Sequence, residues 1–114
     1  MILCWWNVRG LNDPLKFREV KRFLNNQCVS ACGLFETRVK EKNLNLKTTC
    51  FGPNWTWTTN YSSNRKGRIW VGWQHDYIDC HILYSDTQII HCRLSDKSSL
   101  DDNGCGLLER PSVP

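Results

Sequence analysis

The sequence predicts a single layered α/β domain, an α+β-like sandwich in which a β-α-β unit is followed by antiparallel strands. Two apolar runs, residues 2–6 and 28–35, flank a stretch with helical periodicity, which is the order expected of such a unit. Residues 55–94 carry the alternation of half-buried strands instead. A chain of 114 residues has room for one domain of common size.

The first strand, residues 2–6, is apolar on both faces, and we therefore expect a central strand covered on both sides. Asn7 follows at its carboxyl end, and the chain then breaks at Gly10, where a residue without a side chain can adopt angles that others avoid. Arg9 and Asn12 add further donors and acceptors in the same short stretch. The same residues are equally compatible with a strand, a turn and a helix cap that do no chemistry.

The helix that follows is expected to begin at Pro14 and to end near Asn25. Asp13 or Asn12 can cap it, and proline suits its first turn. Its apolar residues fall on one arc and its basic residues on another. The apolar set is Phe17, Val20, Phe23 and Leu24, and the basic set is Arg18, Lys21 and Arg22. The pattern predicts an amphipathic helix with its apolar stripe against the core.

The second strand, residues 28–35, ends in Glu36 and Thr37. A strand, a helix and a strand in this order form a right-handed crossover, which places both strand ends at the same edge of a parallel pair. Asn7 and Glu36 are then expected to project from that edge. An amide oxygen and a carboxylate are ligands that suit a hard cation such as Mg²⁺, so the sequence predicts part of a magnesium site.

The rest of the chain predicts a short helix and two strand pairs. Thr37 is expected to cap a helix through Val39 and Leu44. Residues 55–61 and 68–73 read as an antiparallel hairpin. The tip of this hairpin contains the basic residues Arg65, Lys66 and Arg68. Two interpretations are open: these residues contact a phosphate backbone, or they only keep the hairpin soluble.

Two further strands are expected at residues 77–84 and 87–94, and the apolar periodicity then stops. We therefore expect one domain over residues 1–100 and an irregular tail over 101–114. The six tryptophans lie mostly in these strand patterns, which favours core packing over base stacking.

The net charge of +4 is unevenly distributed. Residues 1–50 contain nine Lys or Arg against four acidic residues, a local charge of +5, whereas residues 51–114 contain six against seven, or −1. A basic first half is compatible with a nucleic-acid partner, and equally with solvated helix faces. No apolar run approaches the roughly 20 residues that span a bilayer, so we expect no membrane partner.

The seven cysteines, an odd number without a secretory signal pattern, are poor material for a disulfide framework and favour a reducing, intracellular setting. Structural zinc is the alternative. The possible ligands are Cys28, Cys32, Cys80, His81, His91 and Cys92, but the chain contains no Cys-x-x-Cys pair.

Two motifs resemble a known family. The first motif is Trp6–Pro14, and the second, which follows the amphipathic helix, is Gly33–Lys40. In this order they resemble the start of the endonuclease/exonuclease/phosphatase superfamily. They resemble more closely the apurinic-type endonuclease domain of plant LINE-type (non-LTR) retrotransposons. The resemblance runs from about Ile2 to about Leu100. It implies a Mg²⁺- or Mn²⁺-dependent hydrolase that nicks DNA in the nucleus, with Asn7 and Glu36 as metal ligands and no small-molecule cofactor. Arg9 and Asn12 are candidate nucleic-acid contacts.

The later motifs of that family, Gly-Asp-x-Asn and a terminal Ser-Asp-His, do not occur in this sequence. The resemblance therefore implies a truncated half of a four-layer β-sandwich flanked by helices, and a catalytically incomplete site, because water has no activating base. A nucleic-acid-binding module without catalysis, or a retroelement remnant without function, remains the alternative. A truncated gene model would have the same sequence.

Overall fold

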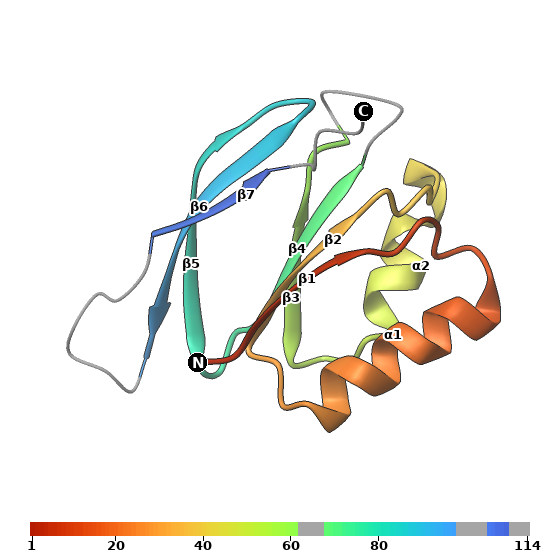
Figure 1. Ribbon diagram of the computed structural model, residues 1–114, viewed down its shortest axis with the longest axis horizontal. Helices are drawn as coiled ribbons and strands as arrows, with labels where there is room; N and C mark the ends of the chain where they lie inside the picture. The colour runs from red at the N-terminus through yellow and green to blue at the C-terminus, as the bar shows by residue number, and fades with distance from the viewer. Residues whose placement is uncertain (62–67, 98–104, 110–114) are drawn as a thin grey trace.

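The structure, a computed structural model, describes residues 1–61, 68–97 and 105–109 (Figure 1). It is a compact mixed α/β domain of two sheets and two helices in which strands predominate. One sheet has the order β1-β2-β4-β3 and the other the order β5-β6-β7. The strands of the first sheet are β1 (Leu3–Asn7), β2 (Ala31–Phe35), β3 (Trp55–Thr59) and β4 (Ile69–Gln74). Those of the second are β5 (Ile78–Ser85), β6 (Ile89–Asp96) and β7 (Cys105–Glu109).

Three layers are visible in Figure 1: the helices, the four-stranded sheet and the three-stranded sheet. The core accordingly has two parts. One fills the space between the helices and the first sheet, with Leu24, Leu34 and Trp70 at its centre. The other lies between the two sheets, where Val71 packs with Ile90. The four-stranded sheet is therefore buried on both faces over most of its width.

The predicted β-α-β unit is confirmed, with β1 and β2 parallel and Asn7 opposite Phe35. The expected central position of the first strand is wrong. β1 lies at an edge of its sheet, and the side chains of Leu3 and Trp5 are 41% and 51% exposed. The local pattern indicates how apolar a strand is, but not whether a second neighbour exists to cover it.

The predicted helix is α1 (Pro14–Asn26). The Asp13 carboxylate accepts a hydrogen bond of 2.9 Å from the Leu15 amide, so Asp13 is the capping residue and Pro14 occupies the first turn. The inward stripe is buried as predicted at Phe17, Val20 and Leu24. The prediction is wrong for Phe23, which lies at the margin of the stripe beside the edge strand β1 and is 41% exposed.

The second helix begins later than predicted. A 3₁₀ turn, η1 (Glu41–Asn43), leads into α2 (Leu44–Thr49). Thr37 does not cap it, because Thr37 lies in the loop that directly follows β2, where its side chain is fully buried. Capping requires a side chain at the helix start, and six residues lie between Thr37 and Leu44.

The strands predicted at 55–61, 68–73, 77–84 and 87–94 are all present as antiparallel neighbours. Gly72 lies directly beneath the indole ring of Trp57, because a Cβ at position 72 would be only 2.5 Å from that ring. β7 lies within the segment expected to be an irregular tail. Its ladder with β6 supplies hydrogen bonds that a short run of residues does not reveal.

Candidate functional site

The candidate site lies at the carboxyl ends of β1 and β2, and we refer to it as the β1–β2 corner. Asn7 ends β1 opposite Phe35, and Glu36 follows Phe35 directly. The two strands are parallel neighbours, so both residues lie at the same edge of the sheet, as the sequence predicts. In open α/β sheets this edge is where ligands bind.

Backbone hydrogen bonds join the two loops of the corner to each other. The amides of Val8, Gly10 and Leu11 donate to the carbonyls of Phe35, Glu36 and Thr37, with lengths of 3.1, 2.8 and 2.8 Å. The Asn12 side chain extends this ladder, because its Nδ2 donates to the Arg38 carbonyl at 2.8 Å. Asn12, a candidate nucleic-acid contact, thus uses its amide donor to hold the loops together.

The backbone of the corner is strained. Arg9, Glu36 and Arg38 have φ angles of 51°, 54° and 57°, in the left-handed region that residues with side chains rarely occupy. Gly10 has φ 107°, which confirms that a residue without a side chain is needed there. Strain of this kind costs about 1–3 kcal/mol per residue and is found preferentially at functional sites.

Two buried oxygens of the corner have no hydrogen-bond partner among the described residues. They are Asn7 Oδ1 and Thr37 Oγ1. A buried polar atom without a partner costs about 1–3 kcal/mol, so such atoms in native proteins call for a water or an ion. The pattern of the sequence gives no sign that Thr37 belongs to the corner, apart from its place next to Glu36.

The donor chemistry of the corner suits a hard cation. An amide oxygen at Asn7 and a carboxylate at Glu36 are the ligand types that Mg²⁺ and Mn²⁺ prefer. Within the described ranges, however, no group of three or more His, Cys, Asp or Glu side chains could hold a metal ion. The corner therefore offers two protein ligands of the six that an octahedral Mg²⁺ takes, which leaves the remainder to water or other oxygens.

The loop that carries Glu36 is anchored at its far end by a buried hydroxyl. Tyr61 donates from its hydroxyl to the Val39 carbonyl at 2.6 Å and accepts a hydrogen bond of 3.0 Å from Trp70 Nε1. All three residues are buried. This contact fixes the loop to β4 and therefore fixes the position of the Glu36 backbone relative to the sheet.

The basic candidates have different surroundings. Arg9 and Arg38 are exposed beside the corner. Arg68 is half-buried, and its guanidinium lies 4.8 Å from the centre of the Tyr61 ring. Arg65 and Lys66 lie outside the described residues. Of the predicted nucleic-acid contacts, Arg9 is thus the one that the structure places at the corner with its side chain exposed and basic.

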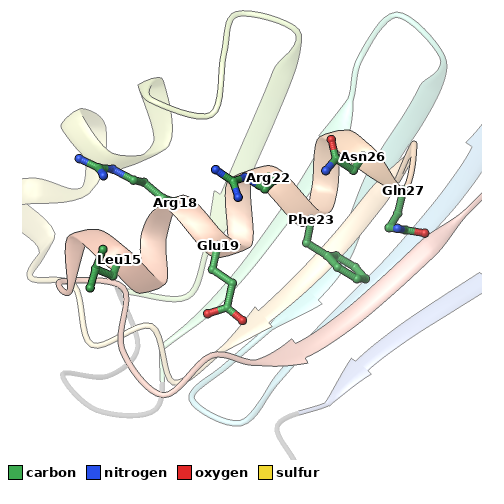
Figure 2. Close-up of a pocket in the computed structure, with 7 residues that line it drawn as sticks. All are labelled: Leu15, Arg18, Glu19, Arg22, Phe23, Asn26 and Gln27. Atoms are coloured by element: carbon green, nitrogen blue, oxygen red, sulfur yellow. The ribbon is translucent and has the colours of Figure 1, made fainter.

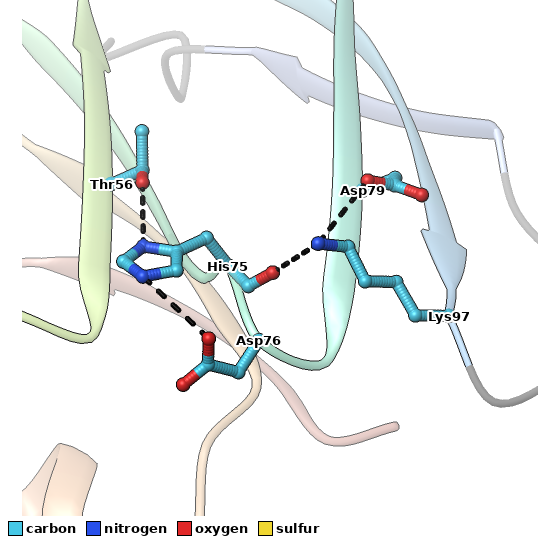
Figure 3. Close-up of polar contacts among 5 residues, drawn as sticks. All are labelled: Thr56, His75, Asp76, Asp79 and Lys97. Carbon is cyan, nitrogen blue, oxygen red and sulfur yellow. Dashed lines mark hydrogen bonds and ion pairs between the residues drawn. The ribbon is translucent and has the colours of Figure 1, made fainter.

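A second polar cluster joins the two sheets, as Figure 3 shows. His75 Nδ1 is 2.9 Å from the Thr56 hydroxyl, while His75 Nε2 is 3.8 Å from the Asp76 carboxylate, beyond hydrogen-bond distance. The ammonium of Lys97 donates to the His75 carbonyl and lies 3.7 Å from Asp79. The imidazole is not oriented by a carboxylate as a general base would be, so this cluster fixes the turn between β4 and β5.

The cysteines lie in several parts of the fold. Cys28 is exposed beyond the end of α1, whereas Cys32 is buried in β2, where burial raises the pKa of its thiol. Cys80 and Cys92 form a pair between the sheets, and a hydrogen bond from Cys80 lowers the pKa of Cys92. The hydrogen bond to Cys92 and burial raise the pKa of the Cys80 thiol. A thiol that stays protonated is a poor metal ligand, so Cys32 and Cys80 do not favour the zinc alternative.

A scan against protein-family models and a search of curated proteins both found no match to this chain. In the portion of the chain that the structure describes, no helix has both the length and the apolar character needed to cross a membrane.

Proposed function

We propose that the chain is the amino-terminal part of a Mg²⁺-dependent, endonuclease-type domain that cleaves phosphodiester bonds in DNA, and that it carries only part of the catalytic site. The single observation that supports this most is the unpartnered, buried Asn7 Oδ1 at the same strand edge as Glu36. The four-layer sandwich of that superfamily belongs to the same proposal. The three layers of the described residues fit it, with a further helical layer expected outside the second sheet.

In this proposal each residue of the corner has a distinct role. Asn7 Oδ1 and the Glu36 carboxylate hold the cation, and the hydrogen bonds between the loops keep these two groups in place. Arg9, exposed beside them, attracts the phosphate. The bound Mg²⁺ would stabilise negative charge on the phosphate as the bond to the leaving oxygen breaks.

Calorimetric titration with Mn²⁺ tests the cation site. We expect Glu36→Gln to weaken binding at least about tenfold, because a neutral amide replaces a charged ligand. Glu41→Gln is the matched control, since Glu41 is an exposed glutamate in the nearby 3₁₀ turn and its loss should leave the affinity unchanged. Equal affinity in the wild-type and Glu36→Gln proteins would contradict the proposal.

A plasmid-nicking assay tests whether catalysis is incomplete. With Mg²⁺ we expect the wild-type protein to nick no faster than Glu36→Ala or an EDTA control, because the corner supplies no base to activate water. Nicking by the wild-type protein that disappears in both controls would show a working site and overturn the proposal that the catalytic site is incomplete. DNA binding that is strongly salt-dependent and indifferent to Glu36 would favour a binding module instead.

A further inference from the structure

Arg9 and Arg38 lie on the two loops that meet at the β1–β2 corner. The amides of Val8 and Gly10, on either side of Arg9, donate hydrogen bonds to carbonyls of the second loop. The Arg38 carbonyl in turn accepts a hydrogen bond of 2.8 Å from the Asn12 side chain on the first loop. These bonds tie the two loops together, so the backbones of the two arginines are held in a fixed relation.

The side chain of Arg38 extends toward the loop that carries Arg9. A Cβ at position 10 would lie 3.8 Å from the Cδ of Arg38, which is an ordinary contact distance. The guanidinium begins at the atom that follows Cδ, so the positive charge of Arg38 lies beside the residue next to Arg9. Both arginine side chains are exposed, and both guanidiniums are therefore accessible to a ligand.

The charges of these two arginines are not compensated by ion pairs. Among the described residues, ion pairs occur at the turn between β4 and β5 and involve neither arginine. Asp13, the acidic residue nearest to Arg9 in the sequence, caps α1. Glu36, the acidic residue nearest to Arg38, is the proposed cation ligand. Like charges that are held near each other repel, and an anion bound between them removes that cost.

The basic residues of α1 have different surroundings. Figure 2 shows Arg18 and Arg22 along a shallow groove of about 440 Å³ on the outward face of the helix, and Glu19 lines the same groove. A carboxylate in the groove offsets part of the positive charge and repels a phosphate. The arginines of the corner are therefore better placed to bind an anion than those of the helix.

We propose that Arg9 and Arg38 form an arginine clamp that binds one phosphodiester group of a nucleic-acid strand. A guanidinium donates hydrogen bonds through a planar fork that matches the oxygens of a phosphate, and two guanidiniums from separate loops can hold one phosphate from two sides. A strand bound there passes the ends of β1 and β2, where Asn7 and Glu36 lie. The assignment of the strand to DNA rests on the proposed function, whereas the arginine clamp does not.

Fluorescence anisotropy with a labelled DNA duplex in EDTA tests the arginine clamp. Arg38→Gln should weaken binding about tenfold at low salt, because a charged donor to the phosphate is lost. The slope of the logarithm of affinity against the logarithm of salt concentration should fall by about one. Arg22→Gln is the matched control, because Arg22 is an exposed arginine on α1 and its replacement should leave the affinity close to that of the wild type.

A double-mutant cycle distinguishes a clamp from two independent charges. The variant that combines Arg9→Gln with Arg38→Gln should lose less affinity than the product of the two single losses, because each arginine depends on a phosphate that the other holds in place. Losses that simply multiply, or an Arg38→Gln protein that binds as Arg22→Gln does, would overturn the proposal. The assay contains no free divalent cation, so a failure of the cation site leaves these results unchanged and the two proposals fail separately.

Two further measurements identify what the clamp recognises. Arg38→Lys keeps the charge but loses the planar fork, so its affinity should lie between those of the wild type and Arg38→Gln. An Arg38→Lys protein that binds as the wild type does would contradict recognition by a fork. In NMR spectra the duplex should shift the amide signals of residues 9–10 and 38, and signals that move with inorganic phosphate but not with the duplex would overturn the assignment to a strand.

Discussion

Replacement of Tyr61 by Phe removes a single hydroxyl that stabilises the loop behind the candidate site. That hydroxyl donates to the Val39 carbonyl at 2.6 Å and accepts from Trp70 Nε1 at 3.0 Å, so Tyr61→Phe breaks two hydrogen bonds. Phe fits the space of Tyr without a new clash. The variant therefore isolates the cost of the lost bonds from changes in packing.

The expected cost follows from what is left behind. The Trp70 indole N–H is fully buried and would have no acceptor, and the Val39 carbonyl, also buried, would lose this donor. An unsatisfied buried donor or acceptor costs about 1–3 kcal/mol, so we expect Tyr61→Phe to lower the free energy of unfolding by about 2 kcal/mol. Urea unfolding followed by tryptophan fluorescence measures this as a shift of the midpoint at constant slope.

Tyr77→Phe is the control, since the Tyr77 side chain is 63% exposed and its replacement should change the free energy by less than about 0.5 kcal/mol. In two-dimensional NMR spectra the indole N–H of Trp70 should shift and exchange faster in Tyr61→Phe alone. A Tyr61→Phe protein as stable as the wild type, with an unchanged indole signal, would refute the role given to this hydroxyl.

Two further predictions concern packing and pH. Gly72→Ala should lower the free energy of unfolding by about 2 kcal/mol, since the new Cβ would lie 2.5 Å from the Trp57 ring. The loss should be smaller in a Trp57→Leu background, where the smaller side chain makes room for the Cβ. Equal losses in both backgrounds, measured by urea unfolding, would contradict the importance of this contact. The Asp86 carboxylate has a pKa below its ordinary 3.8, mainly because it accepts a hydrogen bond from the Gln88 amide. A lowered carboxyl pKa adds stability above the unfolded-state pKa, and this stability disappears as the pH falls through the folded-state pKa. Urea midpoints between neutral pH and about pH 3 should therefore fall more steeply for the wild type than for Asp86→Asn, and parallel curves would contradict this.

The sequence was sufficient for the parts of the fold that depend on local pattern. Asp13 and Pro14 mark the start of α1 because capping and proline geometry act over a few residues. The parallel pairing of β1 with β2 follows from the handedness of the crossover, and it places Asn7 and Glu36 at one edge.

The predictions that were wrong concern features that depend on residues far apart in the sequence. The edge position of β1 could not be predicted, because nothing in an apolar run states how many strands pair with it. Thr37 suits a helix cap, but the loop that it occupies is held by Tyr61, which is 24 residues further along the chain. β7 depends in the same way on its ladder with β6.

The backbone strain at the β1–β2 corner could not be predicted from the sequence either. Gly10 is a residue type that permits a positive φ, whereas Arg9, Glu36 and Arg38 adopt one without any compositional sign. The hydrogen bonds between the two loops impose these angles. Their concentration at the strand ends is consistent with a site that is formed before its ligand arrives.

The most direct test of the account is to locate a bound Mn²⁺ by the broadening that it causes in amide NMR signals. We expect the signals of residues 8–11 and 36–38 to broaden first, and we expect Glu36→Gln to abolish this selectivity while Glu41→Gln preserves it. Broadening centred on Asp76 or Asp79, or spread evenly over the acidic surface, would contradict the claim that the β1–β2 corner is a cation site.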